Sequence, residues 1–157
     1  MSRATRATKM LEEGGVAFTL HSYDYDPGAD RIGIQAAEAL GEPPERLLKT
    51  LMALVDGKPA CVIAPSNREV SMKKVAAAFG GKSAEMMRPA EAKRVSGYKV
   101  GGISPFGQMR KPPTAIEEQS MAHGFVFING GQRRLKVRLN PREAVVLLKA
   151  IVAPLAA

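Results

Sequence analysis

The first residue that could take part in chemistry is a lysine within an apolar stretch. Lys49 lies in the run 47–55, where apolar residues fill both faces of a chain read with a period of two. That pattern is typical of a strand covered on both sides. An ammonium there costs free energy unless it finds a partner or reaches a cleft. The side chain could extend to the sheet edge, which the pattern alone favours, or its amine could line a pocket that binds a phosphate or carbonyl.

Two glycine-rich turns are the next candidates for a binding role. Residues 101–105 read Gly-Gly-Ile-Ser-Pro, and residues 129–131 read Asn-Gly-Gly. Glycine allows a positive φ and lets main-chain N–H groups point at a ligand. Each turn could therefore hold a carbonyl oxygen or a phosphate. The same residues also fit tight connections between strands, and the pattern leaves both interpretations open.

Several other chemistries have little support in the sequence. His21 and His123 have no cysteine or carboxylate at metal-ligand spacing, so we expect no metal site. The sequence has no G-x-S-x-G, P-loop or G-x-G-x-x-G motif, and we expect no cofactor. The single cysteine, Cys61, lies in an apolar run and is expected to fill a buried strand. One cysteine also fits a reducing compartment, so we expect a cytoplasmic protein.

Size and charge limit the class of protein and the kind of partner. The 157 residues are 45% hydrophobic and 24% charged, as expected for one globular domain over residues 1–157. No apolar run approaches a membrane span, and the N-terminus does not resemble a signal peptide. The formal net charge of +8 favours an anionic partner such as nucleic acid, although a generally basic surface is the alternative. Aromatic residues are only 5%, so phosphate contacts should outweigh base stacking.

The elements that must position these residues follow from periodicity and turn chemistry. Asp56-Gly57 predicts a two-residue hairpin between two apolar runs. Ser71 and Asn140 are placed as N-caps, and the last helix is expected to bury Val145, Leu148 and Val152. Hairpins mixed with helices predict an α/β (α+β mixed) fold with a mixed sheet rather than a purely parallel one. We expect helices at 3–13, 32–40, 72–79, 89–96 and 141–152, strands at 16–23, 47–55, 59–64, 83–87, 114–116, 124–128 and 135–139, and a loop at 24–30.

Segments spread over nearly the full length resemble one known family. They are His21-Ser22-Tyr23, Leu48-Lys49-Thr50-Leu51, Ser71-Met72-Lys73-Lys74-Val75-Ala76, residues 97–105, Pro113-Thr114 and Gly130-Gly131. Together they resemble the YbaK/EbsC family, whose best-known members are bacterial Cys-tRNA(Pro) deacylases. The resemblance implies a single domain with a barrel-like mixed sheet flanked by helices and one pocket, similar to the editing domain of many prolyl-tRNA synthetases.

The resemblance also implies an activity. It implies trans-acting deacylation of mischarged aminoacyl-tRNA, above all Cys-tRNA(Pro), in translation quality control. The thiol of the substrate cysteine would attack its own ester and leave as a thiolactone, so the enzyme would be a hydrolase or a lyase. Expected partners are tRNA(Pro) and prolyl-tRNA synthetase. Lys49 matches the essential pocket lysine, and the substrate-binding positions are Tyr23, Thr50, Gly101, Gly102, Ile103, Ser104, Pro105, Asn129 and Gly130.

Two residues depart from the family pattern. Asn129 stands where the family often has serine, and Lys136 stands where many members have an acidic residue or glutamine. Lys136 would add a positive charge at the pocket mouth, and either change could shift which aminoacyl group is accepted. Deacylation is therefore better supported than cysteine specificity. The alternatives are a deacylase for another small amino acid such as alanine, and a non-catalytic module that binds tRNA or the synthetase.

Overall fold

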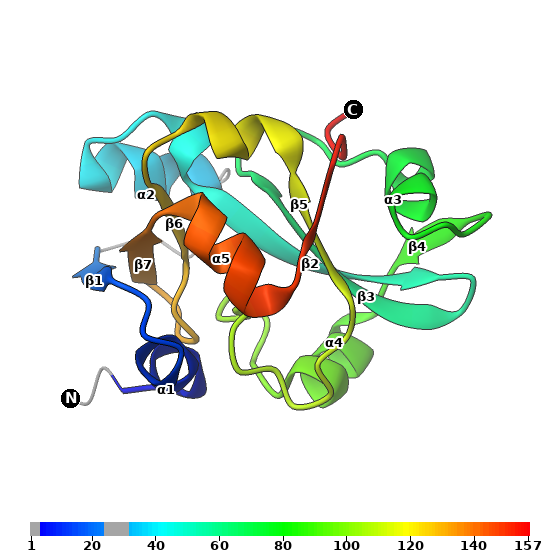
Figure 1. Ribbon diagram of the computed structural model, residues 1–157, viewed down its shortest axis with the longest axis horizontal. Helices are drawn as coiled ribbons and strands as arrows, with labels where there is room; N and C mark the ends of the chain where they lie inside the picture. The colour runs from blue at the N-terminus through cyan, green and yellow to red at the C-terminus, as the bar shows by residue number, and fades with distance from the viewer. Residues whose placement is uncertain (1–3, 24–31) are drawn as a thin grey trace.

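The computed structural model describes residues 4–23 and 32–157, so the loop expected at 24–30 lies outside the described residues. The elements form two sheets with helices packed around them, as Figure 1 shows. The helices are α1 (Arg6–Glu13), α2 (Ile32–Leu40), α3 (Met72–Ala78), α4 (Pro89–Ser96) and α5 (Pro141–Leu148), with 3-10 turns at Pro44–Arg46 and Glu118–Ala122. The strands are β1 (Phe18–Ser22), β2 (Leu48–Val55), β3 (Lys58–Pro65), β4 (Ala84–Met86), β5 (Thr114–Glu117), β6 (Val126–Asn129), β7 (Leu135–Leu139) and β8 (Ile151–Ala153).

The larger sheet is mixed, as the sequence predicts. Its strand order is β4-β2-β3-β5-β8, with antiparallel pairs around β2 and parallel pairs on both sides of β5. The smaller sheet is antiparallel, in the order β1-β7-β6. A parallel bridge between Leu47 and Phe127 joins the start of β2 to β6. This bridge brings the start of β2 against the smaller sheet, and the expected mixed α/β architecture is confirmed.

The hairpin between β2 and β3 is confirmed at its predicted turn. Asp56 and Gly57 have φ angles of 50° and 82°, the left-handed conformations that a tight two-residue turn requires. The carboxylate of Asp56 also accepts hydrogen bonds from the main-chain N–H groups of Lys82 and Ser83. The turn therefore holds the loop before β4 as well as the two long strands.

Both faces of β2 are covered, which confirms the interpretation of its apolar run. Ala53 and Val55 pack in one cluster with residues of α3 and the C-terminal segment. Met52 packs in another cluster, against Met87 and Val95 of the α4 region. The smaller sheet is covered too, because α1 and α5 pack on one face and α2 on the other. In the described part of the chain, no helix is long and apolar enough to cross a membrane.

The predicted extent of the last helix is wrong. Helix α5 ends at Leu148, and Lys149 adopts a left-handed conformation with φ 53° and ψ 43°. The N–H of Ala150 then bonds back to the Val145 carbonyl at 3.0 Å, which closes the helix end. The chain continues as β8, which adds to the free edge of β5. Val152 is consequently 43% exposed, whereas the sequence predicted it to be buried.

Candidate functional site

A cavity of about 350 Å³ opens beside the first half of β2. Strand β4 pairs only with Ala53–Val55, so the preceding residues of β2 have no strand partner on that side. The start of α4, the loop after it, the end of β6 and the start of β7 line the rest of the cavity. The described residues that line the cavity are Leu48, Lys49, Thr50, Leu51, Met52, Met86, Met87, Pro89, Ala92, Val100, Gly101, Ile103, Asn129 and Lys136.

Lys49 lines this cavity, and its amine has a fixed partner. Its Nζ donates a hydrogen bond to the main-chain carbonyl of Arg68 at 2.6 Å. Burial lowers the pKa of Lys49, and the nearby carboxylate of Glu69 partly opposes that shift. An ammonium has three N–H donors, so two remain for a ligand. The amine is thus held in place by the Arg68 carbonyl.

Thr50 contributes a hydroxyl without a partner. Its Oγ1 is buried, and no described residue forms a hydrogen bond with it. A buried hydroxyl in that state is costly, whereas a bound polar ligand or an ordered water would satisfy it. Since Thr50 also lines the cavity, this hydroxyl belongs to the cavity wall.

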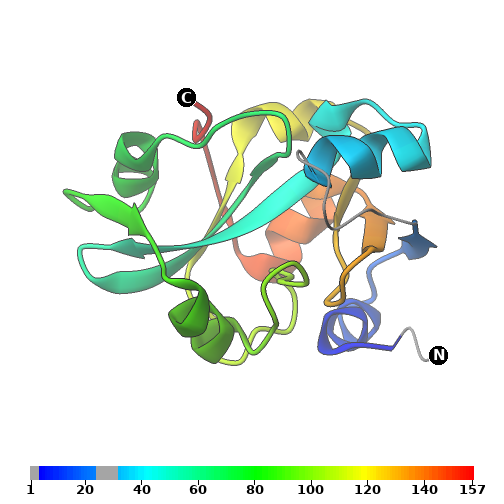
Figure 2. The ribbon, with the colours of Figure 1, turned by 180° about the vertical axis from the view of Figure 1, so that it is seen from behind.

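The two glycine-rich turns form one unit. Asn129 Nδ2 donates to the Gly101 carbonyl at 3.3 Å, while Asn129 Oδ1 accepts from the Gly131 N–H at 2.7 Å. Gly101 has a φ of 91°, and a Cβ there would lie 2.8 Å from Nε of Arg133. Figure 2 shows the loop after α4 beside the turn between β6 and β7. The tertiary structure thus packs one turn on the other at the cavity rim.

Of the remaining predicted positions in the glycine loop, one lines the cavity and the others hold the loop in place. Ile103 lines the cavity, but Gly102, Ser104 and Pro105 do not. Ser104 is fully buried, and its Oγ accepts a hydrogen bond from the Phe106 N–H at 3.2 Å. Pro105 instead borders a second cavity, on the side of α5. The loop therefore presents its first half to the cavity and anchors itself through its second half.

Tyr23 and Gly130 also lie outside the described lining. Tyr23 packs against the cluster of α2 and Phe127, and its N–H bonds to the carbonyl of Arg134 at 3.2 Å. Gly130 accepts a hydrogen bond from Thr5 Oγ1 at 2.6 Å, which ties the cavity rim to the cap of α1. Both residues support the walls, and the residues that follow Tyr23 lie outside the described part of the chain.

The sequence does not mark the apolar wall of the cavity. Met52, Met86 and Met87 come from two strands and the connection into α4, and they give the cavity a flexible apolar side. No sequence motif marks them, because methionines on short strands usually belong to the core. Lys136 also lines the cavity, and burial lowers its pKa to about 8. Cys61 is fully buried, as expected, and burial raises the pKa of its thiol to about 12.

Metal chemistry has no candidate ligand set within residues 4–23 and 32–157. No three histidine, cysteine, aspartate or glutamate side chains lie where they could hold one ion. The cavity lining offers instead two amines, one hydroxyl, one amide and the main chain of a glycine loop. Such groups can bind and orient a polar or anionic substrate, but they include no serine, cysteine or threonine paired with a base.

Comparisons with known proteins agree on one family. The model of the aminoacyl-tRNA editing domain matches residues 26–146. The chain belongs to this family. A curated protein of Enterococcus faecalis, named "Putative Cys-tRNA(Pro)/Cys-tRNA(Cys) deacylase EbsC", is 30% identical over 146 residues, which cover 92% of this chain and 87% of that protein. The resemblance to the YbaK/EbsC family is thereby confirmed.

Other similar proteins contain a matching segment within a larger chain or consist of a chain of about the same extent. A proline–tRNA ligase of Acidithiobacillus ferrooxidans is 27% identical over 95 residues, which cover 60% of this chain but only 16% of the ligase. A solved structure described as "a putative trans-editing enzyme for prolyl tRNA synthetase" superposes with a TM-score of 0.86 at 23% identity, covering 100% of this chain and 98% of that one. That structure confirms the fold of the editing domain over its full length.

Proposed function

We propose that this editing domain is a trans-acting deacylase that releases cysteine from tRNA(Pro) charged with it by mistake. One observation carries the proposal: a single cavity unites the Lys49 amine, the unpaired Thr50 hydroxyl and the Gly101 loop without any protein nucleophile beside a base. Such a site suits a substrate that brings its own nucleophile. Membership of the aminoacyl-tRNA editing family and the similarity to EbsC support the same reaction.

The chemistry follows from the groups in the cavity. The two remaining donors of Lys49 would contact the terminal nucleotide or the ester carbonyl, and the Gly101 main chain would hold the ribose and carbonyl. The thiol sulfur of the cysteine forms a bond to its own carbonyl carbon, and the bond from that carbon to the 3′ oxygen breaks. A thiolactone and a free tRNA result. Holding the thiol against the carbonyl can contribute up to about 7–11 kcal/mol through effective molarity.

The same mechanism explains how correctly charged tRNA would be spared. A proline ester has no thiol, so it cannot attack its own carbonyl, and the described lining holds no serine, cysteine or threonine hydrogen-bonded to a base that could replace it. Cys61 cannot serve, because its thiol is fully buried and its pKa is raised to about 12. Discrimination would therefore rest on the reactivity of the bound amino acid as well as on its size.

The rest of the tRNA would bind outside the cavity. A cavity of about 350 Å³ holds an aminoacyl group with part of its adenosine, not a folded nucleic acid. The net charge of +8 supplies phosphate contacts, while few aromatic residues are available to read bases. We propose that a bound prolyl-tRNA synthetase supplies the identity of the tRNA, which a pull-down with and without tRNA(Pro) would test.

A second candidate is a deacylase for another small amino acid such as alanine. Asn129 and Lys136, the two departures from the family pattern, both line the cavity and favour this candidate. Alanine carries no thiol, so its release would need an activated water. The third candidate, a non-catalytic tRNA- or synthetase-binding module, would keep the fold and lose ester cleavage.

One assay separates these functions. The protein is incubated with tRNA(Pro) charged with cysteine, alanine or proline, and loss of each ester is followed. We expect rapid loss of cysteine, retention of proline, and a rate at least about 100-fold lower for Lys49→Ala. Lys73→Ala on the exposed surface of α3 is the matched control and should retain full activity. Loss of alanine alone would favour the second candidate. Retained tRNA binding without loss of any ester would favour the non-catalytic module.

A further inference from the structure

Lys136 occupies a defined place in the cavity wall. It lies at the centre of a row across the smaller sheet, paired with His21 of β1 on one side and Asn129 of β6 on the other. Residues paired in this way present their side chains on the same face of a sheet. Leu135 and Val137, its neighbours along β7, are buried on the opposite face. The alternation of β7 thus directs Lys136 to the side of the cavity that Asn129 lines.

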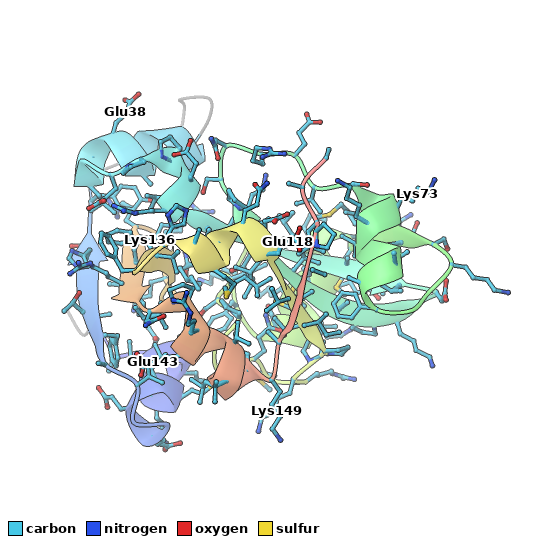
Figure 3. All side chains as sticks on the ribbon, turned by 45° about the horizontal axis from the view of Figure 1, so that its top comes forward. Glu38, Lys73, Glu118, Lys136, Glu143 and Lys149 are labelled. Carbon is cyan, nitrogen blue, oxygen red and sulfur yellow. The ribbon has the colours of Figure 1, made fainter. Side chains whose placement is uncertain are left out.

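The amine of Lys136 differs from that of Lys49 in its surroundings. The Lys49 amine donates to the Arg68 carbonyl, whereas no hydrogen bond or ion pair to a described residue holds the Lys136 amine. These two lysines are the only titratable side chains among the described residues of the lining. In Figure 3 Lys136 lies within the outline of the molecule, whereas Lys73 and Lys149 extend from its periphery.

The titratable groups nearest to Lys136 on its own sheet have other partners. His21 beside it bonds to Thr19 Oγ1 at 2.8 Å, and Arg138 farther along β7 stacks on the ring of Phe125 at 3.9 Å. From β2 the nearest titratable group of the lining is Lys49, and β4 and α4 present only apolar side chains to the cavity. Burial is the cause that lowers the pKa of Lys136 to about 8. A fraction of the amine is therefore neutral near physiological pH, and a neutral amine can accept a proton.

We propose that Lys136 is the group that accepts the thiol proton of the substrate cysteine in this editing domain. The inference rests on the proposed function, since it assigns a proton acceptor to the thiol-assisted reaction. Its support is position: Asn129, the neighbour of Lys136 across the sheet, is hydrogen-bonded to the Gly101 loop that would hold the ester. Lys136 is also the amine of the lining that no protein carbonyl occupies.

The proposed step balances without any further reactant. The S–H proton moves to the neutral Nζ of Lys136, and the resulting thiolate forms a bond to the ester carbonyl carbon. As the bond between that carbon and the 3′ oxygen breaks, the Lys136 ammonium returns the proton to the leaving oxygen. The products are a thiolactone and a tRNA with a free 3′ hydroxyl, and Lys136 ends as it began.

Selenocysteine provides the decisive substrate, because a selenol is already ionised at neutral pH and needs no base. We compare the wild type and Lys136→Met on tRNA(Pro) charged with cysteine or with selenocysteine. The variant should lower kcat for the cysteinyl ester by about 10²–10³-fold, the range of a general base, with little change in KM. On the selenocysteinyl ester, the rates of the wild type and of Lys136→Met should agree within a few-fold. Lys136→Arg keeps the charge but cannot accept a proton, so it should fail on cysteine too.

Two other results for Lys136→Met would overturn its role as proton acceptor. Equal losses on both esters would mean that Lys136 acts through binding or structure, and undiminished cleavage of the cysteinyl ester by Lys136→Met would mean that it has no role. Either result leaves the proposed function standing, provided that the wild type cleaves the cysteinyl ester and Lys49→Ala does not. A wild type without activity on cysteine would overturn both proposals. Thermal unfolding of each variant shows whether it is folded in the assay.

Discussion

Asn129 links the two glycine-rich turns of the editing domain, because its amide donates to the Gly101 carbonyl at 3.3 Å and accepts from the Gly131 N–H at 2.7 Å. Both polar atoms of the side chain are thus engaged within the protein. The residue holds the rim of the cavity in shape, and the position of the Gly101 main chain depends on it.

Replacing Asn129 with alanine should impair catalysis more than folding. The Gly101 loop would lose its link to β6, and misplacement of a positioning group costs about 10–100-fold in rate. The two lost hydrogen bonds should lower the free energy of unfolding by about 1–3 kcal/mol. Asn67→Ala is the matched control, because the Asn67 side chain forms an exposed hydrogen bond to Glu45. Deacylation kinetics and urea unfolding are the measurements, and unchanged kinetics for Asn129→Ala would refute the positioning role.

Gly101 should not tolerate even alanine. Its φ of 91° is strained for any residue with a Cβ, and the added carbon would lie 2.8 Å from Nε of Arg133. We expect Gly101→Ala to lower stability by about 1–2 kcal/mol and deacylation by at least 10-fold. Gly124→Ala is the control, since a Cβ there meets no atom within 4 Å and needs no positive φ. Equal behaviour of the two variants would mean that the loop adapts freely.

Lys136→Met should stabilise the protein in a pH-dependent way. Burial lowers the pKa of Lys136 from an ordinary 10.5 to about 8, so the folded state binds this proton less tightly than the unfolded state does. The cost of the charge is fully present below pH 8 and disappears as the pH rises towards 10.5. The gain should be about 1–3 kcal/mol at pH 7 and fade above pH 10. Thermal unfolding across this pH range, with exposed Lys58→Met as control, tests it.

Acid should loosen the C-terminal segment through Glu117. Burial alone would raise the pKa of its carboxyl, but hydrogen bonds from the N–H groups of Gln119, Leu155 and Ala156, together with Arg68, lower it overall. A carboxylate with a depressed folded pKa stabilises the protein above its unfolded value, and that stability is lost as the pH falls through the folded pKa.

The corresponding variant, Glu117→Gln, should lose stability at pH 7 by about 1–3 kcal/mol and become less sensitive to acid. A reduction in activity is also expected. Arg68 bonds to the Ala157 carbonyl through Nη2 and to the Lys49 amine through its main chain, so the C-terminus and the cavity share one residue. Glu118→Gln, which changes an exposed carboxylate next to it, is the control. An acid titration of unfolding that is identical in wild type and Glu117→Gln would contradict this role.

Binding of tRNA should weaken steeply with salt. The formal net charge is +8 and the described lining offers no aromatic ring for stacking, so phosphate contacts should dominate affinity. We expect the association constant for uncharged tRNA(Pro) to fall about 10-fold or more between about 50 and 200 mM salt. Filter binding over that range measures it. An affinity that does not change with salt would count against phosphate contacts.

Much of the local structure could be predicted because it depends on neighbouring residues. The Asp56-Gly57 turn, the Ser71 cap and the strand 135–139 all follow from short patterns. The end of α5 could not, because Lys149 leaves the helix to let β8 pair with β5, and β5 lies more than thirty residues earlier in the chain. A free strand edge elsewhere in the fold decided that boundary, and no local propensity reports it.

For the site, the sequence by itself determined which residue types were available: a lysine on an apolar strand, two glycine turns, and no nucleophile with a base. The tertiary structure decided which of them meet. It tied Lys49 to the Arg68 carbonyl, joined the two turns through Asn129, and turned Ser104 and Pro105 away from the cavity. It also placed Lys136 in the wall of that cavity, where the family resemblance predicts a charge at the pocket mouth. A strand pattern fixes the face on which a side chain lies, but the elements packed on that face decide whether water or a cavity surrounds it.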